Sequence, residues 1–268
     1  MIVIDELLPG QMMARKRGIQ EAANSIVLFC DDDNHLSSDY ITEALKVFKK
    51  FPEVGIVGGW CKPKLSFYPG KWIESNYGAL AIEANPRSEG YTNWVFGAGM
   101  LIRKKIFMEM KSKGIELLLT GRLGTKHTSG DDAEICQISR FLGHKVYYTP
   151  NLILFHKIAP HRLSRWSFIK ANFRNGHIVK YFYIMEALIK DADVQNDKLY
   201  FSFTKSRIFD IFYFIPRIIF GKSNFFSFMI FYQNIQLLYE IVLGKTEFAN
   251  TYDQIKRNLY GRERGEVK

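Results

Sequence analysis

The chain has 268 residues, of which 47% are hydrophobic and 24% charged, so it is long enough for one large domain or a domain with an appendage. Its formal net charge of +10 favours an anionic partner: a phosphorylated substrate, an anionic membrane leaflet or nucleic acid. The three cysteines form no paired framework, which excludes a disulfide-stapled secreted domain and favours a cytoplasmic protein.

The chain opens with a predicted strand, residues 2–4, followed by a predicted helix, residues 11–23. Met12 and Ile19 fall on one face of this helix, and Arg15 lies on the same stripe. A charge on an inward face usually has a partner. Arg15 therefore either snorkels to the surface or contacts an anion.

Three consecutive carboxylates follow the apolar run 25–30, which is typical of a buried strand. At the end of such a strand Asp31, Asp32 and Asp33 would repel one another and lose hydration, and a divalent cation is the simplest compensation. In open α/β sheets ligands gather at the carboxyl ends of strands, where these residues would lie. The alternative is a solvated acidic turn that leads into the next helix.

The following helix is predicted to be capped by Ser37 or Ser38 and to end near residue 50. Its predicted buried side consists of Ile41, Leu45 and Phe48.

A short strand is predicted over residues 55–59, and irregular structure over residues 61–92. The run 94–103 has the pattern of a strand that Gly97 and Gly99 interrupt. Glycine inside a strand marks a bulge or a place where a ligand approaches the backbone closely.

A second acidic cluster opens the helix predicted after residue 130. Ser129 has the spacing of a capping residue, with Asp132 three positions later, so these acids have a plain role in stabilising a helix N-terminus. However, Asp131, Asp132 and Glu134 are more carboxylates than capping needs, and one of them is a candidate general base.

Two short strands are predicted over residues 146–148 and 152–155, and His156 follows the second. Taken alone, His156 is more often a structural histidine than a ligand. The alternation of strands and helices up to this point predicts an α/β fold with helices flanking a sheet.

After residue 160 the character of the sequence changes, so we expect a core of residues 1–160 and a basic, aromatic, helical region of residues 161–268. A long helix is predicted over residues 164–190. Two apolar segments follow between residues 207 and 243, and neither is long and apolar enough to be a convincing membrane span. They favour an amphipathic extension in peripheral contact with an anionic membrane face, and the alternative is a helical cap on the core.

Four segments, in this order along residues 11–177, resemble motifs of the family-2 glycosyltransferases with the Rossmann-like GT-A fold. Residues 14–18 (ARKRG) resemble the family's "ARNxG" segment, with Lys16 in place of Asn, and residues 29–34 (FCDDDN) resemble "FLDxDD". Residues 130–134 (GDDAE) resemble "GEDxE", and residues 156–163 (HKIAPHRL) resemble the variant "HxIxxxRL". Each motif is weak by itself, and the ordered set is specific.

The resemblance implies roles for the residues that match. Asp33 and His156 would hold a divalent metal, Mn²⁺ or Mg²⁺, and Asp132 falls on the position of the catalytic base. Asp31 would contact the ribose or a metal-bound water, and Arg15 and Arg162 would contact the phosphates of the donor. Weaker candidates for contacts with the sugar or the acceptor are Trp94, Gly97, Gly99, Asp131 and Glu134.

The implied activity is the metal-assisted, inverting transfer of a sugar from a nucleoside-diphosphate sugar to a hydroxyl of a glycan or lipid-linked saccharide. A nucleic-acid partner is not expected, because the basic residues are dispersed and no such motif is present.

One departure from the family is that nothing here matches its opening strand of the "VSVIIPTYN" kind, so the core is expected to be incomplete at its N-terminus. The first alternative is therefore a truncated, non-catalytic, membrane-peripheral module that binds nucleotide sugars. The second is a sugar nucleotidyltransferase, which would need a glycine- and lysine-rich phosphate loop near the N-terminus, and none is present.

Overall fold

The computed structural model describes residues 3–119, 121–123, 126–127, 130–219, 231–232, 234–235, 238 and 244–261. The chain forms two compact units, one of Met1–Pro69 and Tyr77–Leu163 and the other of Gly70–Asn76 and Ser164–Lys268. That the short segment Gly70–Asn76 joins the C-terminal unit was not predicted from the sequence.

The first unit is built on a six-stranded mixed sheet with the order β1-β5-β3-β8-β2, in which β4 also pairs with β8. Its strands are β1 (Ile26–Leu28), β2 (Asn34–Leu36), β3 (Val54–Leu65), β4 (Gly90–Thr92), β5 (Leu101–Arg103) and β8 (Lys145–Ile158). The long central pair β3–β8 is parallel, and the other pairs are antiparallel. A separate hairpin joins β6 (Arg122–Leu123) and β7 (Lys126–His127).

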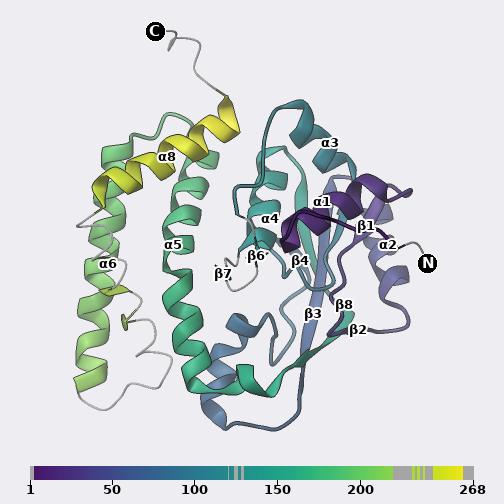
Figure 1. Cartoon of the computed structure of the whole chain (residues 1–268), viewed down its shortest axis with the longest axis horizontal. Helices are drawn as coiled ribbons and strands as arrows, with labels where there is room; N and C mark the ends of the chain where they lie inside the picture. Colours follow the sequence, from purple (N-terminus) through teal and green to yellow (C-terminus); the bar gives the residue numbers. More distant parts are fainter. Residues whose placement is uncertain are drawn as a thin grey trace. The chain divides into compact units, whose positions relative to one another are not determined.

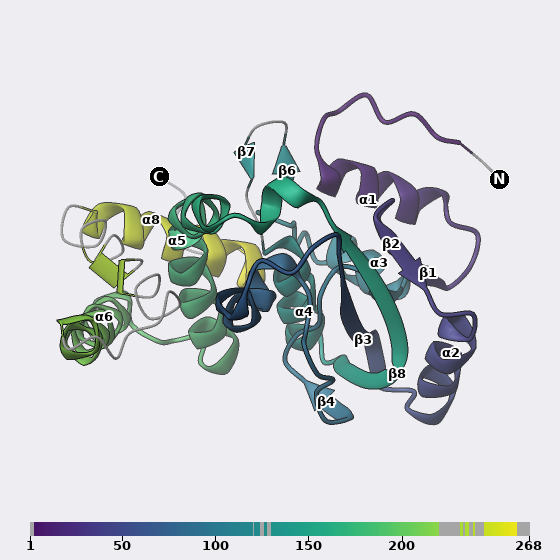
Figure 2. The ribbon, with the colours of Figure 1, turned by 90° about the horizontal axis from the view of Figure 1, so that it is seen from below.

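Helices cover this sheet. They are α1 (Gln11–Glu21), α2 (Tyr40–Lys50), α3 (Lys105–Ser112) and α4 (Asp131–Phe141), and the short 3-10 helix η2 (Pro160–Leu163) follows β8. Another 3-10 helix, η1 (Lys71–Leu80), begins in the segment that belongs to the other unit. Figures 1 and 2 show α2 and α4 on opposite sides of the β3–β8 pair. The predicted α/β architecture is confirmed, as are the helices that were expected near residues 11, 104 and 131.

The predicted buried face of α2 is wrong in two of its three positions. Ile41 is 54% exposed and Leu45 46% exposed, whereas Phe48 is buried as expected. The helix turns Tyr40 inward instead, and the hydroxyl of Tyr40 donates to the carbonyl of Gly99 at 2.8 Å. This buried hydrogen bond fixes the rotation of α2, because an unpaired hydroxyl in the core would be costly.

Two of the predicted strands, at residues 2–4 and 94–103, differ from the structure. Residues 3–4, within the strand expected at 2–4, are not extended strand, and residue 2 lies outside the described part. Within the run 94–103 only β5 is a strand, because residues 97–100 form a turn in which Gly99 has a φ of +74° and the N–H of Met100 donates to the carbonyl of Gly97 at 3.3 Å.

The two strands expected between residues 146 and 155 are a single strand, β8. Its pairing with β3 jumps from Gly59↔Thr149 to Trp60↔Ile153, so residues 150–152 bulge out without ending the strand. Gly59 permits the bulge, because a Cβ at this position would collide with Leu152.

The second unit is helical. Its helices are α5 (Arg165–Lys190), which confirms the prediction for residues 164–190, α6 (Asn196–Ile219) and α8 (Lys245–Tyr260). Lys180 of α5 is only 5% exposed, and its ammonium pairs with Glu247 of α8 at 2.6 Å. Most of the apolar segment 225–243 lies outside the described residues. In the part of the chain that the structure describes, no helix has both the length and the apolar content needed to cross a membrane.

Candidate functional site

The acidic triplet lies beside the loop that precedes β5. The N–H of Phe29 donates to the carbonyl of Met100 at 2.9 Å, and the N–H of Gly99 donates to the carbonyl of Phe29 at 3.0 Å. These bonds continue the antiparallel pairing of β1 and β5 by one step. The chain therefore leaves the sheet directly into the triplet, where Asp31 and Asp32 are exposed and Asp33 is partly buried.

Asp33 and His156 come together from segments far apart in the sequence. His156 lies on the buried face of β8 together with Leu154 and Ile158, and it is 5% exposed. Its Nε2 is 3.3 Å from Oδ2 of Asp33. The pairing of β2 with β8 fixes this arrangement, since Asn34 is directly opposite His156.

The N-terminus of α4 presents the second acidic cluster. Gly130, with a φ of +100°, occupies the position before the helix, while the predicted capping residue Ser129 lies outside the described residues. Oδ2 of Asp132 accepts the N–H of Gly97 at 2.9 Å, and its Oδ1 accepts the N–H of Ala133 at 2.8 Å. The loop before β5 and the helix α4 thus meet at Asp132.

Arg15 of α1 forms an ion pair with Asp131, and each side chain is only 10% exposed. The predicted need of Arg15 for a partner is confirmed, although that partner is a carboxylate of the protein. Its guanidinium also lies over the ring of Phe29, 5.0 Å from the centroid. A Cβ on Gly97 would come within 3.0 Å of Arg15 and 3.1 Å of Asp132, so only glycine leaves the loop this close to both.

The two acidic segments influence each other electrostatically. Burial raises the pKa of Asp131, and the neighbouring charges of Asp132 and Asp31 raise it further, while Arg15 lowers it. Burial wins over the ion pair, so the net direction is upward. The contribution of Asp31 places the triplet within electrostatic range of α4.

The other predicted residues have varied surroundings. Trp94 is 41% exposed, and the half-buried Arg162 lies in η2, just after β8. Glu134 has no exposed surface, and its two oxygens accept the N–H groups of Leu118 and Leu119 at 2.8 and 2.9 Å. Its carboxylate therefore holds a neighbouring loop of the protein, and Glu134 is not placed to touch a substrate.

The site offers two side chains to a metal rather than a complete shell. Among the described residues no group of three or more His, Cys, Asp or Glu side chains is arranged to hold a metal ion. Within that same part of the chain, Oδ1 of Asp33 and Nδ1 of His156 are buried and have no hydrogen-bond partner. Buried polar atoms usually have partners, so these two atoms are exceptions that a bound ion would account for.

Two residues of this region were missed from the sequence. Asn34 follows the triplet directly, faces the same side of the sheet as His156, and buries amide atoms that have no partner among the described residues. Its adjacency to the carboxylates was the available signal. Tyr40, which holds the carbonyl of Gly99, had no signal beyond its place near a helix start.

Comparison with known protein families gives one match. The model of the family described as "Glycosyltransferase like family 2" matches residues 4–177, which is more than half of the chain and includes every residue of this candidate site. No curated protein matches the chain.

Proposed function

The chain belongs to the glycosyltransferase-like family 2, and from this premise we propose that it transfers a sugar from a nucleoside-diphosphate sugar to a hydroxyl acceptor. The mixed sheet with helices on both sides is of the GT-A type. One observation supports the proposal above the others. A chain of contacts joins segments that are distant in sequence: the N–H of Gly97 donates to Asp132, the N–H of Gly99 in the same loop donates to the carbonyl of Phe29 just before the acidic triplet, and Asp33 of that triplet lies against His156.

Asp132 is proposed as the general base. Its two oxygens each accept one backbone N–H, from Gly97 and Ala133, and an ionised carboxylate has about four lone-pair positions. The remaining positions can accept the proton of an attacking hydroxyl. Because the two N–H groups fix the orientation of the carboxylate, the attacking oxygen would meet it in one geometry.

Asp33 and His156 are proposed to hold the divalent cation, and their chemistry fits one. The carboxylate of Asp33 suits Mn²⁺ or Mg²⁺, whereas the imidazole of His156 is a donor typical of transition metals, and each side chain has a buried atom without a partner among the described residues. Mg²⁺ commonly binds through one or two carboxylates together with substrate phosphates and waters, so an incomplete protein shell is expected. When bound, such an ion supplies Lewis-acid neutralisation of the leaving diphosphate.

The remaining residues are proposed to position the reactants. Arg162 would contact the donor phosphates and Asp31 the ribose, while Arg15 holds Asp131 beside the base. At Gly97 and Gly99 the protein itself fills the space beside the backbone, since a Cβ would lie 3.1 Å from Asp132 at Gly97 and would collide with Tyr40 at Gly99. Trp94, with 41% of its surface exposed, offers an aromatic face to a sugar ring. Attack by a hydroxyl on the face opposite the leaving group would invert the anomeric centre.

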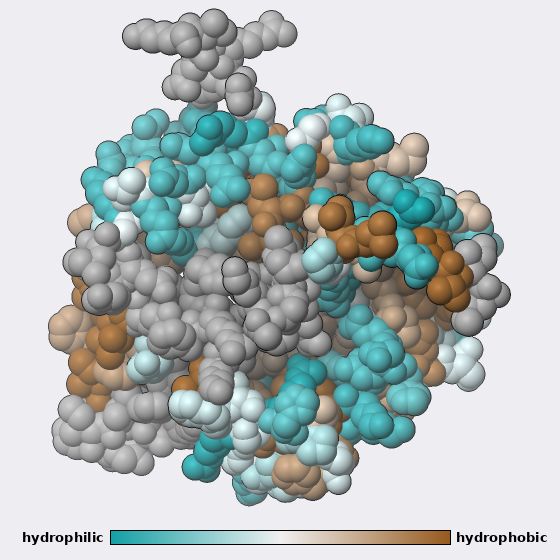
Figure 3. Space-filling view, viewed as in Figure 1, coloured by the Kyte–Doolittle hydropathy of each residue, from teal (hydrophilic) through white to brown (hydrophobic). Residues whose placement is uncertain are grey.

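An anionic membrane face is the proposed location of the acceptor. The exposed side of α6 carries Phe201, Ile208, Phe209 and Phe212, which are between 40% and 70% exposed, and Lys205 lies among them. Hydrophobic side chains are visible at the surface over α6, at the left edge of Figure 3. An apolar helical face with basic residues, on a chain of net charge +10, suits the interface of an anionic bilayer.

The test is release of nucleoside diphosphate from a panel of nucleotide sugars, in the presence of hydroxyl acceptors and of Mn²⁺ or Mg²⁺. We expect release and sugar transfer with at least one donor, and loss of both after EDTA treatment. A protein that binds a donor and never releases the diphosphate with any acceptor would instead be the non-catalytic binding module. A protein that binds no donor would contradict both the transferase and the binding-module proposals.

A further inference from the structure

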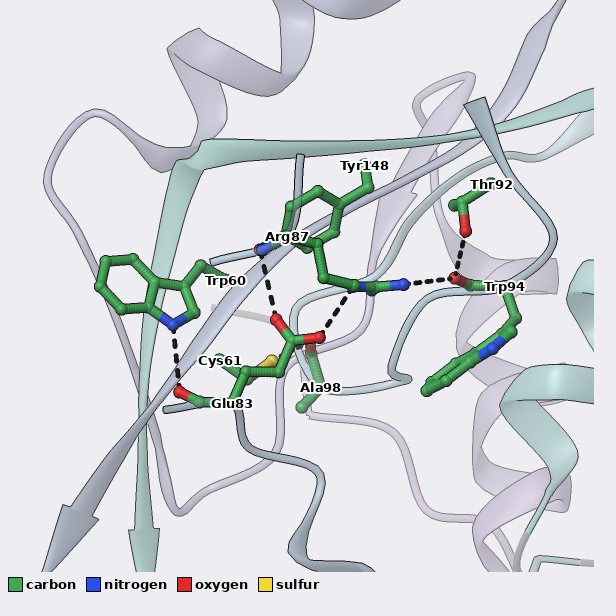
Figure 4. A network of polar contacts seen from close by, with 8 residues as sticks. All are labelled: Trp60, Cys61, Glu83, Arg87, Thr92, Trp94, Ala98 and Tyr148. Carbon is green, nitrogen blue, oxygen red and sulfur yellow. Dashed lines mark hydrogen bonds and ion pairs between the residues drawn. The ribbon is translucent and has the colours of Figure 1, made fainter. Parts of the chain in front are cut away.

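A partly buried ion pair lies next to the loop that reaches Asp132. The carboxylate of Glu83, which is 14% exposed, forms an ion pair with Nε of Arg87 at 2.8 Å. It also accepts a hydrogen bond from the hydroxyl of Tyr148 at 3.2 Å (Figure 4). Burial raises the pKa of Glu83, whereas Arg87 and the Tyr148 hydroxyl lower it. The pair is therefore held in a place where a lone carboxylate would be unfavourable.

Glu83 is itself fastened to the sheet. Its N–H donates to the carbonyl of Cys61 at 2.8 Å, and its carbonyl accepts the indole N–H of Trp60 at 3.1 Å. Both partners belong to β3, the long central strand, and Tyr148 belongs to its neighbour β8. The residue whose carboxylate orients Arg87 is thus hydrogen-bonded to both strands of the central β3–β8 pair.

Arg87 in turn contacts both the ring and the backbone carbonyl of Trp94. Its guanidinium lies between two rings, 4.3 Å from the centroid of Tyr148 and 5.2 Å from that of Trp94. Its Nη1 also donates to the carbonyl of Trp94 at 3.4 Å, and Thr92 donates to the same oxygen at 3.3 Å. A planar guanidinium can stack and donate at once, which a lysine ammonium cannot.

Trp94 leads directly to the proposed base. The two residues after it, Val95 and Phe96, are buried at 0% and 7% exposure, and the next N–H, that of Gly97, donates to Asp132. Because Val95 and Phe96 are packed in the core, the carbonyl of Trp94 and this N–H have little freedom to move relative to each other. A displacement at Trp94 is therefore transmitted to the hydrogen bond of Asp132.

We propose that Arg87 is a positioning residue, which through Trp94 sets the Gly97 N–H that orients Asp132. This inference rests on the proposed function, because it takes Asp132 to be the base. A role in folding alone would be shared by any partly buried arginine of the unit. Arg103 is such an arginine: it donates to the carbonyls of Val54 and Phe48 at 2.8 and 2.9 Å, stacks on Phe48, and touches none of the network.

The kinetic test compares Arg87→Lys with Arg103→Lys as the matched control. We expect Arg87→Lys to lower kcat about 10-fold or more with the donor KM within about twofold of wild type, because small misplacements of a catalytic group weaken turnover strongly. Arg103→Lys should lower the melting temperature at least as much and leave kcat within about twofold. Equal kcat in the two variants at matched stability would overturn the proposal.

A second arm needs no activity and guards against failure to fold. The double variant Glu83→Gln/Arg87→Met removes both charges, so neither is left buried and unpaired. Hydrogen exchange of the segment 94–100 should be faster in this variant than in wild type, and unchanged in Arg103→Lys. Unchanged exchange in the double variant would show that Arg87 does not hold the loop. If the wild-type protein transfers no sugar, the proposed function fails, and this exchange measurement still decides the role of Arg87.

Discussion

Burial and the ion pair with Arg15 shift the pKa of Asp131 in opposite directions, and the sequence alone could not show which effect is larger. The stripe on the first helix predicted that Arg15 needs a partner, and a carboxylate supplies it from 116 residues away in the sequence. Spacing alone did not show which acid of the cluster 131–134 would pair, which would be buried and which would face the loop. The rotation of α4 decides this, and Asp131, Asp132 and Glu134 have three different surroundings as a result.

The ion pair predicts a pH-dependent loss of stability in Arg15→Met. Breaking a buried pair leaves an uncompensated charge, so the variant should lose about 3 kcal/mol of unfolding free energy near neutral pH. Arg15 is the main influence lowering the pKa of Asp131, which burial already raises, so its removal moves this pKa higher. With this raised pKa, Asp131 of the variant takes up a proton as the pH falls, and the buried unpaired charge disappears. The deficit in unfolding free energy should therefore narrow as the pH falls from about 8 to 5.

Urea unfolding of wild type and variant across this pH range measures the deficit. The control is Arg15→Met/Asp131→Asn, which should recover most of the lost stability at neutral pH because no buried charge remains. A deficit that widens on acidification would contradict the assignment of Asp131 as the buried, charge-sensitive partner.

At the scale of elements, periodicity predicted most helices and the central strands, and it failed where a tertiary contact overrides the local pattern. On α2 the apolar residues at 40, 41, 44, 45, 47 and 48 fit two faces nearly equally. The hydrogen bond of Tyr40 to Gly99 selects one, and no local signal reveals that contact. Two separate strands were predicted on either side of residues 149–151, yet the bulge opposite Gly59 lets one strand, β8, continue.

The helix α6 has one buried face and one exposed face. Leu199 and Phe203 are 6% and 0% exposed and pack inward, whereas Phe209 and Phe212 are 70% and 68% exposed. If the outer face rests on a membrane, Phe209→Ser/Phe212→Ser should weaken binding to vesicles that contain phosphatidylserine by about tenfold or more, because each exposed aromatic buries apolar area at the interface.

Co-sedimentation with phosphatidylserine vesicles and with purely zwitterionic vesicles makes this measurement. Binding should fall with added salt, as expected for a basic chain at an anionic surface. Ile41→Ser, which removes a 54% exposed apolar side chain from α2, is the matched control and should bind as wild type does. Equal binding by the control and the double variant would remove α6 from the contact.

At the scale of the whole chain, the ordered motifs predicted the family and the fold, and both are confirmed. The geometry of the site was only partly predictable. The sequence indicated that Asp33 and His156 belong to one centre, and the pairing of β2 with β8 brings them together. The network of Glu83 and Arg87 was not predicted, because it lies in the segment 61–92, which has no clear periodicity and was expected to be irregular.

The central claim is that Asp132 accepts the proton of the attacking hydroxyl. The direct measurement is single-turnover sugar transfer at saturating donor by wild type and by Asp132→Asn, together with donor affinity by calorimetry. An amide keeps the shape of the carboxylate and accepts no proton. Transfer should therefore fall by about 10³-fold while the donor Kd stays within about twofold. Transfer by Asp132→Asn within about tenfold of wild type would contradict the assignment.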